Sequence, residues 1–178
     1  MELNNKPKLI LLCGPPCSGK STWIKNNNGD NLEVLSTDNW IEEQAKSIGK
    51  TYSEVFDHFI KPAVANLCAN LQLYTSQKES FIVDQTNVNP KSRRKKLILC
   101  EEYYKVAVYF EVSLETLLER NTQRPGKYVP ESVIKSMFET YSRPSVEEGF
   151  DLIIPGTESE TVPDASQTQL LYDMILDI

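Results

Sequence analysis

Short apolar runs recur along the chain, separated by longer stretches in which apolar residues return with helical spacing. Each run is five to eight residues long, which suits a buried strand better than a helix. The runs cover residues 8–13, 32–36, 80–84, 105–112 and 150–155. Strands that alternate with amphipathic helices are typical of a parallel sheet covered by helices. The pattern therefore predicts an α/β fold with a five-stranded parallel sheet.

Start signals mark the helices between these runs. Ser53 precedes a long stretch with helical spacing, and Pro62 within it predicts a kink. Ser113 begins a segment that resembles a capping box, and Pro130 opens a further helix. Residues 167–178 have the pattern of a final helix docked on the body.

Charge is distributed unevenly over the 178 residues, whose net charge is −6. Residues 156–178 hold five acids and no Lys or Arg; this segment carries −5, so residues 1–155 carry the remaining −1. The length suits one compact domain. We expect a domain at residues 1–155 followed by an acidic tail at 156–178. The nearly neutral domain leaves room for the local basic groove that nucleic-acid binding requires.

The four cysteines, Cys13, Cys17, Cys68 and Cys100, have no CxxC spacing, and the chain has one histidine. This argues against a zinc site or a disulfide framework and favours a reducing compartment. The apolar run at 8–13 is too short for a secretion signal or a membrane span. We expect a cytoplasmic or nuclear protein that is not secreted and has no membrane partner.

Residues 14–21, GPPCSGKS, lie between the first apolar run and a helical pattern. The spacing G-x-x-x-x-G-K-[ST] is that of a loop that wraps nucleotide phosphates. Gly14 and Gly19 let the backbone turn around phosphate oxygens, Lys20 reaches the outer phosphates, and Ser21 ligates Mg²⁺. The alternative is a plain glycine turn before a helix. The chain lacks the N-K-x-D segment of GTPases, so we expect ATP with Mg²⁺.

Two carboxylates follow predicted strands. Asp84 ends the run at 80–84, where it either holds a metal-bound water or serves as a turn residue. Asp38 follows the run at 32–36 and begins the next helical pattern. It either takes a proton from an acceptor hydroxyl or caps the helix, and its position alone leaves both roles open.

Two groups of basic residues follow later in the chain. Arg120 and Arg124 lie one turn apart on one predicted helix face, just before Pro125 and Gly126. They form either a short lid over the phosphates or a solvated surface. The segment PKSRRKK at 90–96 is either a solvated helix start or a surface that binds the phosphates of a nucleic-acid strand.

Several of these segments together resemble one family. GPPCSGKSTW, STD, VDQTNVNPKSRR, ERNTQR and RPSVEEGFDLIIP follow the order found in the 5′-polynucleotide kinase domain of phage and mammalian end-healing enzymes. The resemblance covers residue 8 to about residue 155. It implies a P-loop NTPase fold of the adenylate-kinase-like type with a short lid. It also implies transfer of the γ-phosphate of ATP to the 5′-hydroxyl of a DNA or RNA end.

The resemblance implies a role for each matching residue. The catalytic residues it implies are Asp38 as general base, Lys20 and Arg124. The nucleotide-binding residues it implies are Gly14, Cys17, Ser18, Gly19, Lys20, Ser21, Thr22, Arg120 and Arg124. Mg²⁺ would be held by Ser21 directly and by Asp84 through water. The acceptor would be bound by Thr86, Asn87 and Arg93.

The chain departs from this family in two ways. Ile41 stands three residues after Asp38, where the phage enzyme has an arginine that helps hold the acceptor. The family's phosphatase module has no counterpart, so a phosphatase or a ligase would be a separate partner. Trp40 and Tyr52 are candidates to stack on a terminal base. Two other functions stay open: a small-metabolite or nucleoside kinase on the same fold, and an ATP-binding module without catalysis.

Overall fold

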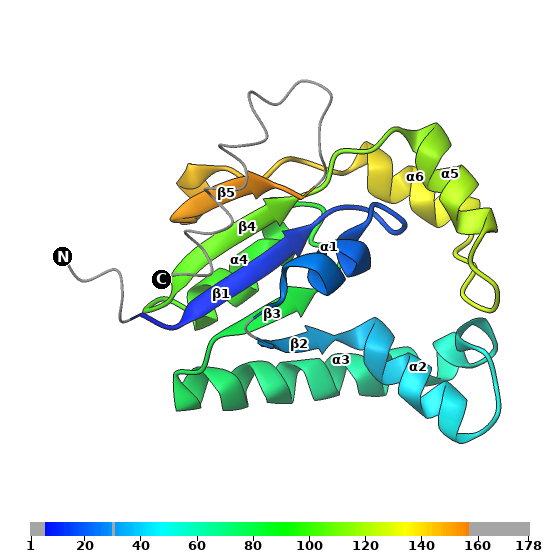
Figure 1. Cartoon of the computed structure of the whole chain (residues 1–178), viewed down its shortest axis with the longest axis horizontal. Coiled ribbons are helices and arrows are strands. Elements are labelled where there is room, and N and C mark those ends of the chain that lie inside the picture. The colour runs from blue at the N-terminus through cyan, green and yellow to red at the C-terminus, as the bar shows by residue number, and fades with distance from the viewer. Residues whose placement is uncertain (1–5, 30, 157–178) are drawn as a thin grey trace.

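The structure is a computed structural model that describes residues 6–29 and 31–156. Within these residues one parallel sheet has the strand order β2-β3-β1-β4-β5 (Figure 1). The strands are β1 (Lys8–Cys13), β2 (Glu33–Ser36), β3 (Phe81–Asp84), β4 (Tyr104–Tyr109) and β5 (Leu152–Pro155). Each lies within or overlaps one predicted apolar run, so the predicted five-stranded α/β fold is confirmed.

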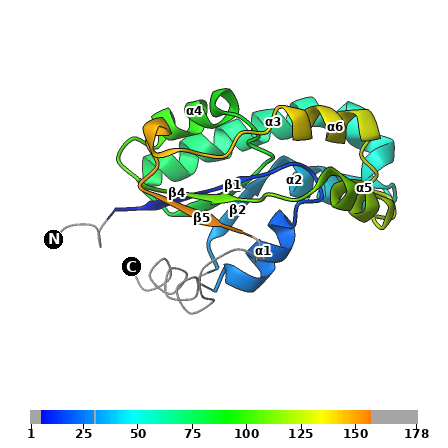
Figure 2. The ribbon, with the colours of Figure 1, turned by 90° about the horizontal axis from the view of Figure 1, so that it is seen from above.

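The connecting helices cover both faces of this sheet. They are α1 (Lys20–Asn27), α2 (Thr37–Ser47), α3 (Tyr52–Gln77), α4 (Pro90–Leu99), α5 (Leu114–Thr122) and α6 (Glu131–Glu139), with a short 3-10 helix η2 (Val146–Glu148). Figure 2 shows α3 and α4 on one face and α1 on the other. In the central strand, Leu9 and Leu11 pack toward α3 and α4, whereas Ile10 and Leu12 pack toward α1. Both faces are buried, which explains why the strands read as unbroken apolar runs.

The helix starts follow local capping chemistry. Helix α3 begins two residues earlier than Ser53 predicts, because Thr51 and Glu54 form a capping box in which the Glu54 carboxylate accepts the Thr51 backbone N–H at 2.8 Å. Ser113 caps α5 as predicted and accepts the backbone N–H of Thr116 at 3.2 Å. Pro130 is the N-cap of α6, also as predicted.

The carboxyl edge of the sheet brings distant segments together. The chain leaves β1 for β2 and leaves β3 for β4, so the crossovers run to opposite sides and open a crevice at this edge. The loops after β1 and β3 lie side by side there, since the Gly14 N–H donates to the Thr86 carbonyl at 2.8 Å. This edge therefore gathers the predicted phosphate loop, Asp38 and Asp84.

Two predictions concern the ends of the chain. The final helix expected at 167–178 lies outside the described residues, and the division into a domain at 1–155 and an acidic tail stays a prediction. Across the described part of the chain, none of the helices has both the length and the apolarity to cross a bilayer.

Candidate active site

The loop after β1 has the backbone of a phosphate cradle. Gly19 has φ +104° and Cys17 has φ +65°, so the chain turns sharply before α1 begins. No side chain caps α1, which leaves the first N–H groups of this helix facing the loop. The Lys20 ammonium donates to the carbonyls of Gly14 at 3.0 Å and Pro15 at 2.8 Å. Lys20 thus folds back onto its own loop, and one of its three ammonium donors remains for an anion.

Two further loop features fit a bound nucleotide. The Ser18 hydroxyl is buried and has no hydrogen-bond partner among the described residues. The side chains of Ser21 and Thr22 in the first turn of α1 are exposed. The buried Ser18 hydroxyl and the N–H groups of the loop can therefore donate hydrogen bonds to phosphate oxygens. The exposed Ser21 hydroxyl oxygen is available as a ligand for Mg²⁺.

A lysine and two carboxylates lie close enough at this edge of the sheet for their charges to interact. Burial lowers the pKa of Lys20, and the nearby charges of Asp84 and Asp38 oppose that shift. Burial raises the pKa of Asp84, and Lys20 opposes that shift. Lys20 and Asp84 are thus the main counter-charges of each other. The Asp84 carboxylate lies at the carboxyl end of β3 beside the loop, where it suits a metal-bound water.

Asp38 faces the crevice from the first turn of α2. Ser36 caps this helix by accepting the Asn39 N–H at 3.3 Å, so Asp38 is not the N-cap and its carboxylate is free for other contacts. One carboxylate oxygen accepts the Tyr52 hydroxyl at 3.0 Å, and the other lies 3.1 Å from the Lys127 ammonium. The side chain is 44% exposed and therefore reachable by a ligand. Two donors fix its orientation.

Two arginines reach the loop from α5 and the residue after its C-cap. Arg120 donates to the Cys17 carbonyl at 3.3 Å, and Arg124 donates to the Cys17 sulfur at 3.5 Å. Asn121, which sequence analysis missed, is buried between them. Its amide donates to the Val129 carbonyl at 2.8 Å and accepts the Val129 N–H at 3.1 Å. Asn121 therefore holds residues 123–130, which we call the lid bridge, against α5.

The lid bridge spans the mouth of the crevice to the start of α3, where the two loops lie side by side at one end of the molecule (Figure 1). The Ser53 N–H donates to the Gly126 carbonyl at 3.0 Å, and the Ser53 hydroxyl accepts the Tyr128 N–H at 3.1 Å. Lys127 binds Glu42 as well as Asp38. The predicted lid is thus joined to the wall that carries Asp38.

The residues predicted to bind the acceptor divide in two. Thr86 lines the crevice, and Asn87, although only 2% exposed, also borders it. Asn87 has φ +45°, and its amide donates to the Leu12 carbonyl at 2.7 Å, which ties the loop after β3 to β1. Asn87 therefore fixes the position of the loop after β3 at the carboxyl edge of the sheet, through its backbone conformation and its side-chain hydrogen bond.

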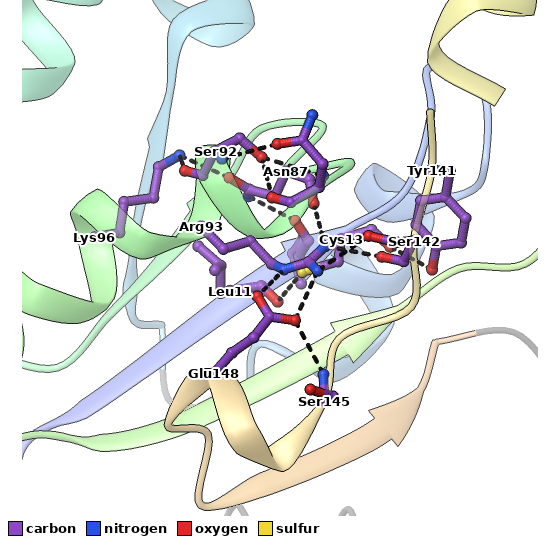
Figure 3. Close-up of polar contacts among 12 residues, drawn as sticks. Leu11, Cys13, Asn87, Ser92, Arg93, Lys96, Tyr141, Ser142, Ser145 and Glu148 are labelled. Atoms are coloured by element: carbon purple, nitrogen blue, oxygen red, sulfur yellow. Dashed lines mark hydrogen bonds and ion pairs between the residues drawn. The ribbon is translucent and has the colours of Figure 1, made fainter. Parts of the chain in front are cut away.

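Arg93 is not among the residues that line the crevice, and its predicted contact with the acceptor stays a prediction. Its guanidinium is fully buried and forms two 2.7 Å bonds with the Glu148 carboxylate (Figure 3). It also donates to the carbonyls of Asn87 and Ser142, both at 2.9 Å. The sequence offered no signal for this pair, because Glu148 lies 55 residues away. Arg93 joins α4, the loop after β3 and η2.

The crevice is large and has three walls. Its volume is about 2090 Å³. The phosphate loop forms one wall together with the loop after β3 and Lys96 of α4. Helices α2 and α3 with Asp38 and Tyr52 form the second wall, and the lid bridge with Val133 and Met137 of α6 forms the third. Trp40 is absent from these walls and packs edge-on against Phe59, so it belongs to the α2–α3 core rather than to a base-stacking surface.

Comparison with known proteins agrees with this fold and loop. A family model described as "AAA domain" (AAA_33) matches residues 9–144. L-seryl-tRNA(Sec) kinase of Methanococcus maripaludis is 31% identical over 181 residues, which cover 94% of this chain and 64% of that protein. Heterogeneous nuclear ribonucleoprotein U-like protein 2 of Mus musculus is 30% identical over 148 residues, covering 77% of this chain and 20% of that protein.

One solved structure extends the fold comparison. Chaetomium thermophilum Kti12 in complex with ADP-AlF3 superposes with a TM-score of 0.66 at 18% identity, covering 95% of this chain and 97% of that chain. The chain spans about two thirds or less of its curated relatives, and the narrower resemblance to 5′-polynucleotide kinases stays a prediction. The family match, the parallel sheet and the nucleotide loop agree: the chain belongs to the AAA domain family (AAA_33) and has a P-loop kinase fold.

Proposed function

We propose that this protein transfers the γ-phosphate of ATP to the 5′-hydroxyl of a DNA or RNA end. The observation that carries the proposal is the placement of Asp38. Its carboxylate is exposed to the crevice, held by two donors, and close enough to Lys20 and Asp84 to influence the pKa of both. A carboxylate in this position can take the proton of an acceptor hydroxyl beside the phosphate loop.

The surrounding residues supply positioning and positive charge. Lys20 and the N–H groups of α1 would hold the outer phosphates, and Ser21 with Asp84 would hold Mg²⁺. When bound there, Mg²⁺ would help neutralise the negative charge that develops on the phosphates. Arg120 and Arg124 already meet the loop at Cys17, so they are placed to contact the same phosphates. Phosphoryl transfer depends mostly on such positioning and neutralisation.

The size of the crevice leaves room for a large acceptor beside the donor nucleotide. Pockets for small ligands usually measure about 300–1,000 Å³. The 2090 Å³ crevice exceeds that range but also has to hold the donor ATP, and one wall carries Lys96 of the basic segment. A small-metabolite kinase would need a more enclosed site than this one. An ATP-binding module without catalysis would not require a carboxylate such as Asp38 on the crevice wall.

The similarity to L-seryl-tRNA(Sec) kinase supports a second candidate acceptor, the seryl hydroxyl of a seryl-tRNA. The relative with 31% identity across most of this chain is named for a seryl group on tRNA. A seryl hydroxyl, like a 5′-hydroxyl, is a primary alcohol attached to a polynucleotide, so the same base and phosphate loop would serve it. This chain matches only 64% of that protein, and the 5′-hydroxyl is the acceptor we test first.

The experiment measures transfer of labelled γ-phosphate from ATP-Mg²⁺ to 5′-hydroxyl DNA and RNA oligonucleotides. Matched oligonucleotides with a 5′-phosphate control for the acceptor group, and seryl-tRNA tests the second candidate. Asp38→Asn should lower turnover by roughly 10²-fold or more while ATP binding is retained. Asp57→Asn, another carboxylate on the crevice wall, is the matched control and should change turnover by less than about twofold.

Three outcomes separate the possibilities. Transfer to 5′-hydroxyl ends that Lys20→Ala and Asp38→Asn abolish supports the proposal. Transfer to seryl-tRNA alone moves the acceptor to the seryl hydroxyl. ATP binding without transfer to any of these acceptors rejects the proposal.

A further inference from the structure

The structure sorts the cations of the basic segment at residues 91–96 into three groups. Arg93 is buried against Glu148, as described above. Lys91, Arg94 and Lys95 are exposed on α4. Lys96 alone among them lines the crevice. The exposed cations have the properties of an ordinary solvated helix face, whereas Lys96 has a different environment.

The contacts of Lys96 leave its charge without a counter-charge. Its ammonium donates to the Asn87 side-chain carbonyl at 2.7 Å and to the Ser92 backbone carbonyl at 3.1 Å (Figure 3). An ammonium has three donors, so one remains for a ligand. Within residues 6–29 and 31–156, no carboxylate lies within 4.0 Å of it.

In the free protein, the lack of a counter-charge disfavours the charged form of Lys96. The titratable groups that influence the pKa of Lys96 are the thiols of Cys13 and Cys68 and the neighbouring Lys95. None of them is a carboxylate. Burial therefore lowers the pKa of Lys96 to about 8. A half-buried cation that is not neutralised by the protein is typical of a site where a ligand brings the opposite charge.

The position of Lys96 indicates which ligand group it meets. It lies on the α4 side of the crevice, bonded to Asn87, which follows Thr86 and the β3 strand end. Arg120, Arg124 and Lys20 gather at the phosphate loop, which is the donor side. Lys96 instead reaches the crevice beside the loop after β3, where it is bonded to Asn87 next to Thr86.

We propose that Lys96 is an anion-binding residue of the acceptor side, which contacts a phosphate group of the polynucleotide whose terminal hydroxyl reacts. This inference rests on the proposed function, because it assigns a residue to the acceptor of that reaction. The hydrogen bonds to Asn87 and Ser92 hold the ammonium in place. The phosphate of the acceptor supplies the missing negative charge.

The test compares two acceptors that differ in one phosphate. A nucleoside 3′-phosphate and the matching nucleoside both carry a 5′-hydroxyl, but only the first carries the anion. Lys96→Gln removes the charge and keeps a donor for Asn87. It should lower kcat/KM for the nucleoside 3′-phosphate by about ten- to a hundredfold, mainly through KM, and leave the nucleoside within about twofold. Lys96→Arg should restore most of the loss.

A binding measurement works even without turnover. Affinity for a 5′-hydroxyl single strand is measured by fluorescence anisotropy at several salt concentrations. One lost phosphate contact should lower the slope of log affinity against log salt by about 0.7 in Lys96→Gln. Lys95→Gln is the matched control: its exposed ammonium lies one residue away, and we expect less than half that change.

The outcomes separate this inference from the proposed function. An equal loss on both acceptors, or an unchanged salt slope, overturns the role of Lys96 even if transfer is observed. A changed salt slope without any transfer keeps the Lys96 site and rejects the proposed reaction. Absence of oligonucleotide binding by the wild type overturns both.

Discussion

The buried pair of Arg93 and Glu148 should be a main determinant of stability. Glu148→Gln keeps the shape of the side chain but removes its charge, which leaves the Arg93 guanidinium buried without a counter-charge. The Arg93 side chain is 0% exposed and that of Glu148 is 13% exposed, so water cannot compensate for the loss. Breaking a buried pair in this way costs about 3–5 kcal/mol. Domains of this size have a free energy of unfolding of about 5–15 kcal/mol, so the loss is large.

The assay is thermal and urea unfolding followed by circular dichroism. For a chain of this length each kcal/mol shifts Tm by about 2–4 °C, so Glu148→Gln should lower Tm by about 6–20 °C. Glu147→Gln is the matched control on the same 3-10 helix. Glu147 is exposed, and the change should stay within about 0.5 kcal/mol.

A double variant tests the electrostatic reasoning. Arg93→Met with Glu148→Leu removes both charges, so it should recover a substantial part of the stability lost in Glu148→Gln. The reasoning is refuted if Glu148→Gln unfolds within about 1 kcal/mol of the Glu147→Gln control. A double variant less stable than the single one would show that hydrogen bonds to Asn87 and Ser142, rather than the unpaired charge, dominate.

Three other predictions follow from contacts in the crevice. Tyr52→Phe removes the 3.0 Å bond to Asp38, so kcat should fall by roughly threefold to tenfold with little change in the KM for ATP, as steady-state kinetics would measure. In Gly14→Ala a Cβ would lie 2.7 Å from the Ser18 hydroxyl, so the loop must shift; we expect a loss of about 1–3 kcal/mol in unfolding experiments and weaker binding in a nucleotide titration. Lys96, with a pKa of about 8, is charged below that pH and neutral above it. Oligonucleotide affinity should therefore fall as the pH rises from about 7 to about 9, and a flat profile in wild type, or an equal fall in Lys96→Gln, would contradict this.

Local patterns predicted the parts of the site that depend on local backbone geometry. Gly14 and Gly19 could be recognised because a phosphate loop requires glycine at that spacing. Asp38 and Asp84 could be recognised because each follows an apolar strand, and parallel strand ends meet at one edge. The distinction between base and N-cap for Asp38 needed the structure, which assigns the cap to Ser36.

Contacts between distant segments could not be predicted in this way. Arg93 and Lys96 belong to one basic segment, yet one is buried against Glu148 and the other lines the crevice. Their helical positions differ by three residues, and the partner of Arg93 lies beyond two further helices. Lys127 likewise meets Asp38 from 89 positions away in the sequence. Sequence spacing on a helix shows which residues share a face, but not what that face meets.

The lid bridge ties the rim of the crevice near α5 to the start of α3. Its hydrogen bonds at Ser53 are solvent-exposed, and exposed bonds of this kind contribute only about 0.5–1.5 kcal/mol each. If these bonds have to break before an acceptor enters, a cost of a few kcal/mol leaves an open population of about 0.1–10%. An acceptor that enters only the open state has its apparent affinity reduced by that fraction. The cost of opening would therefore lower the apparent affinity of every acceptor by the same factor, without any contact that distinguishes one acceptor from another.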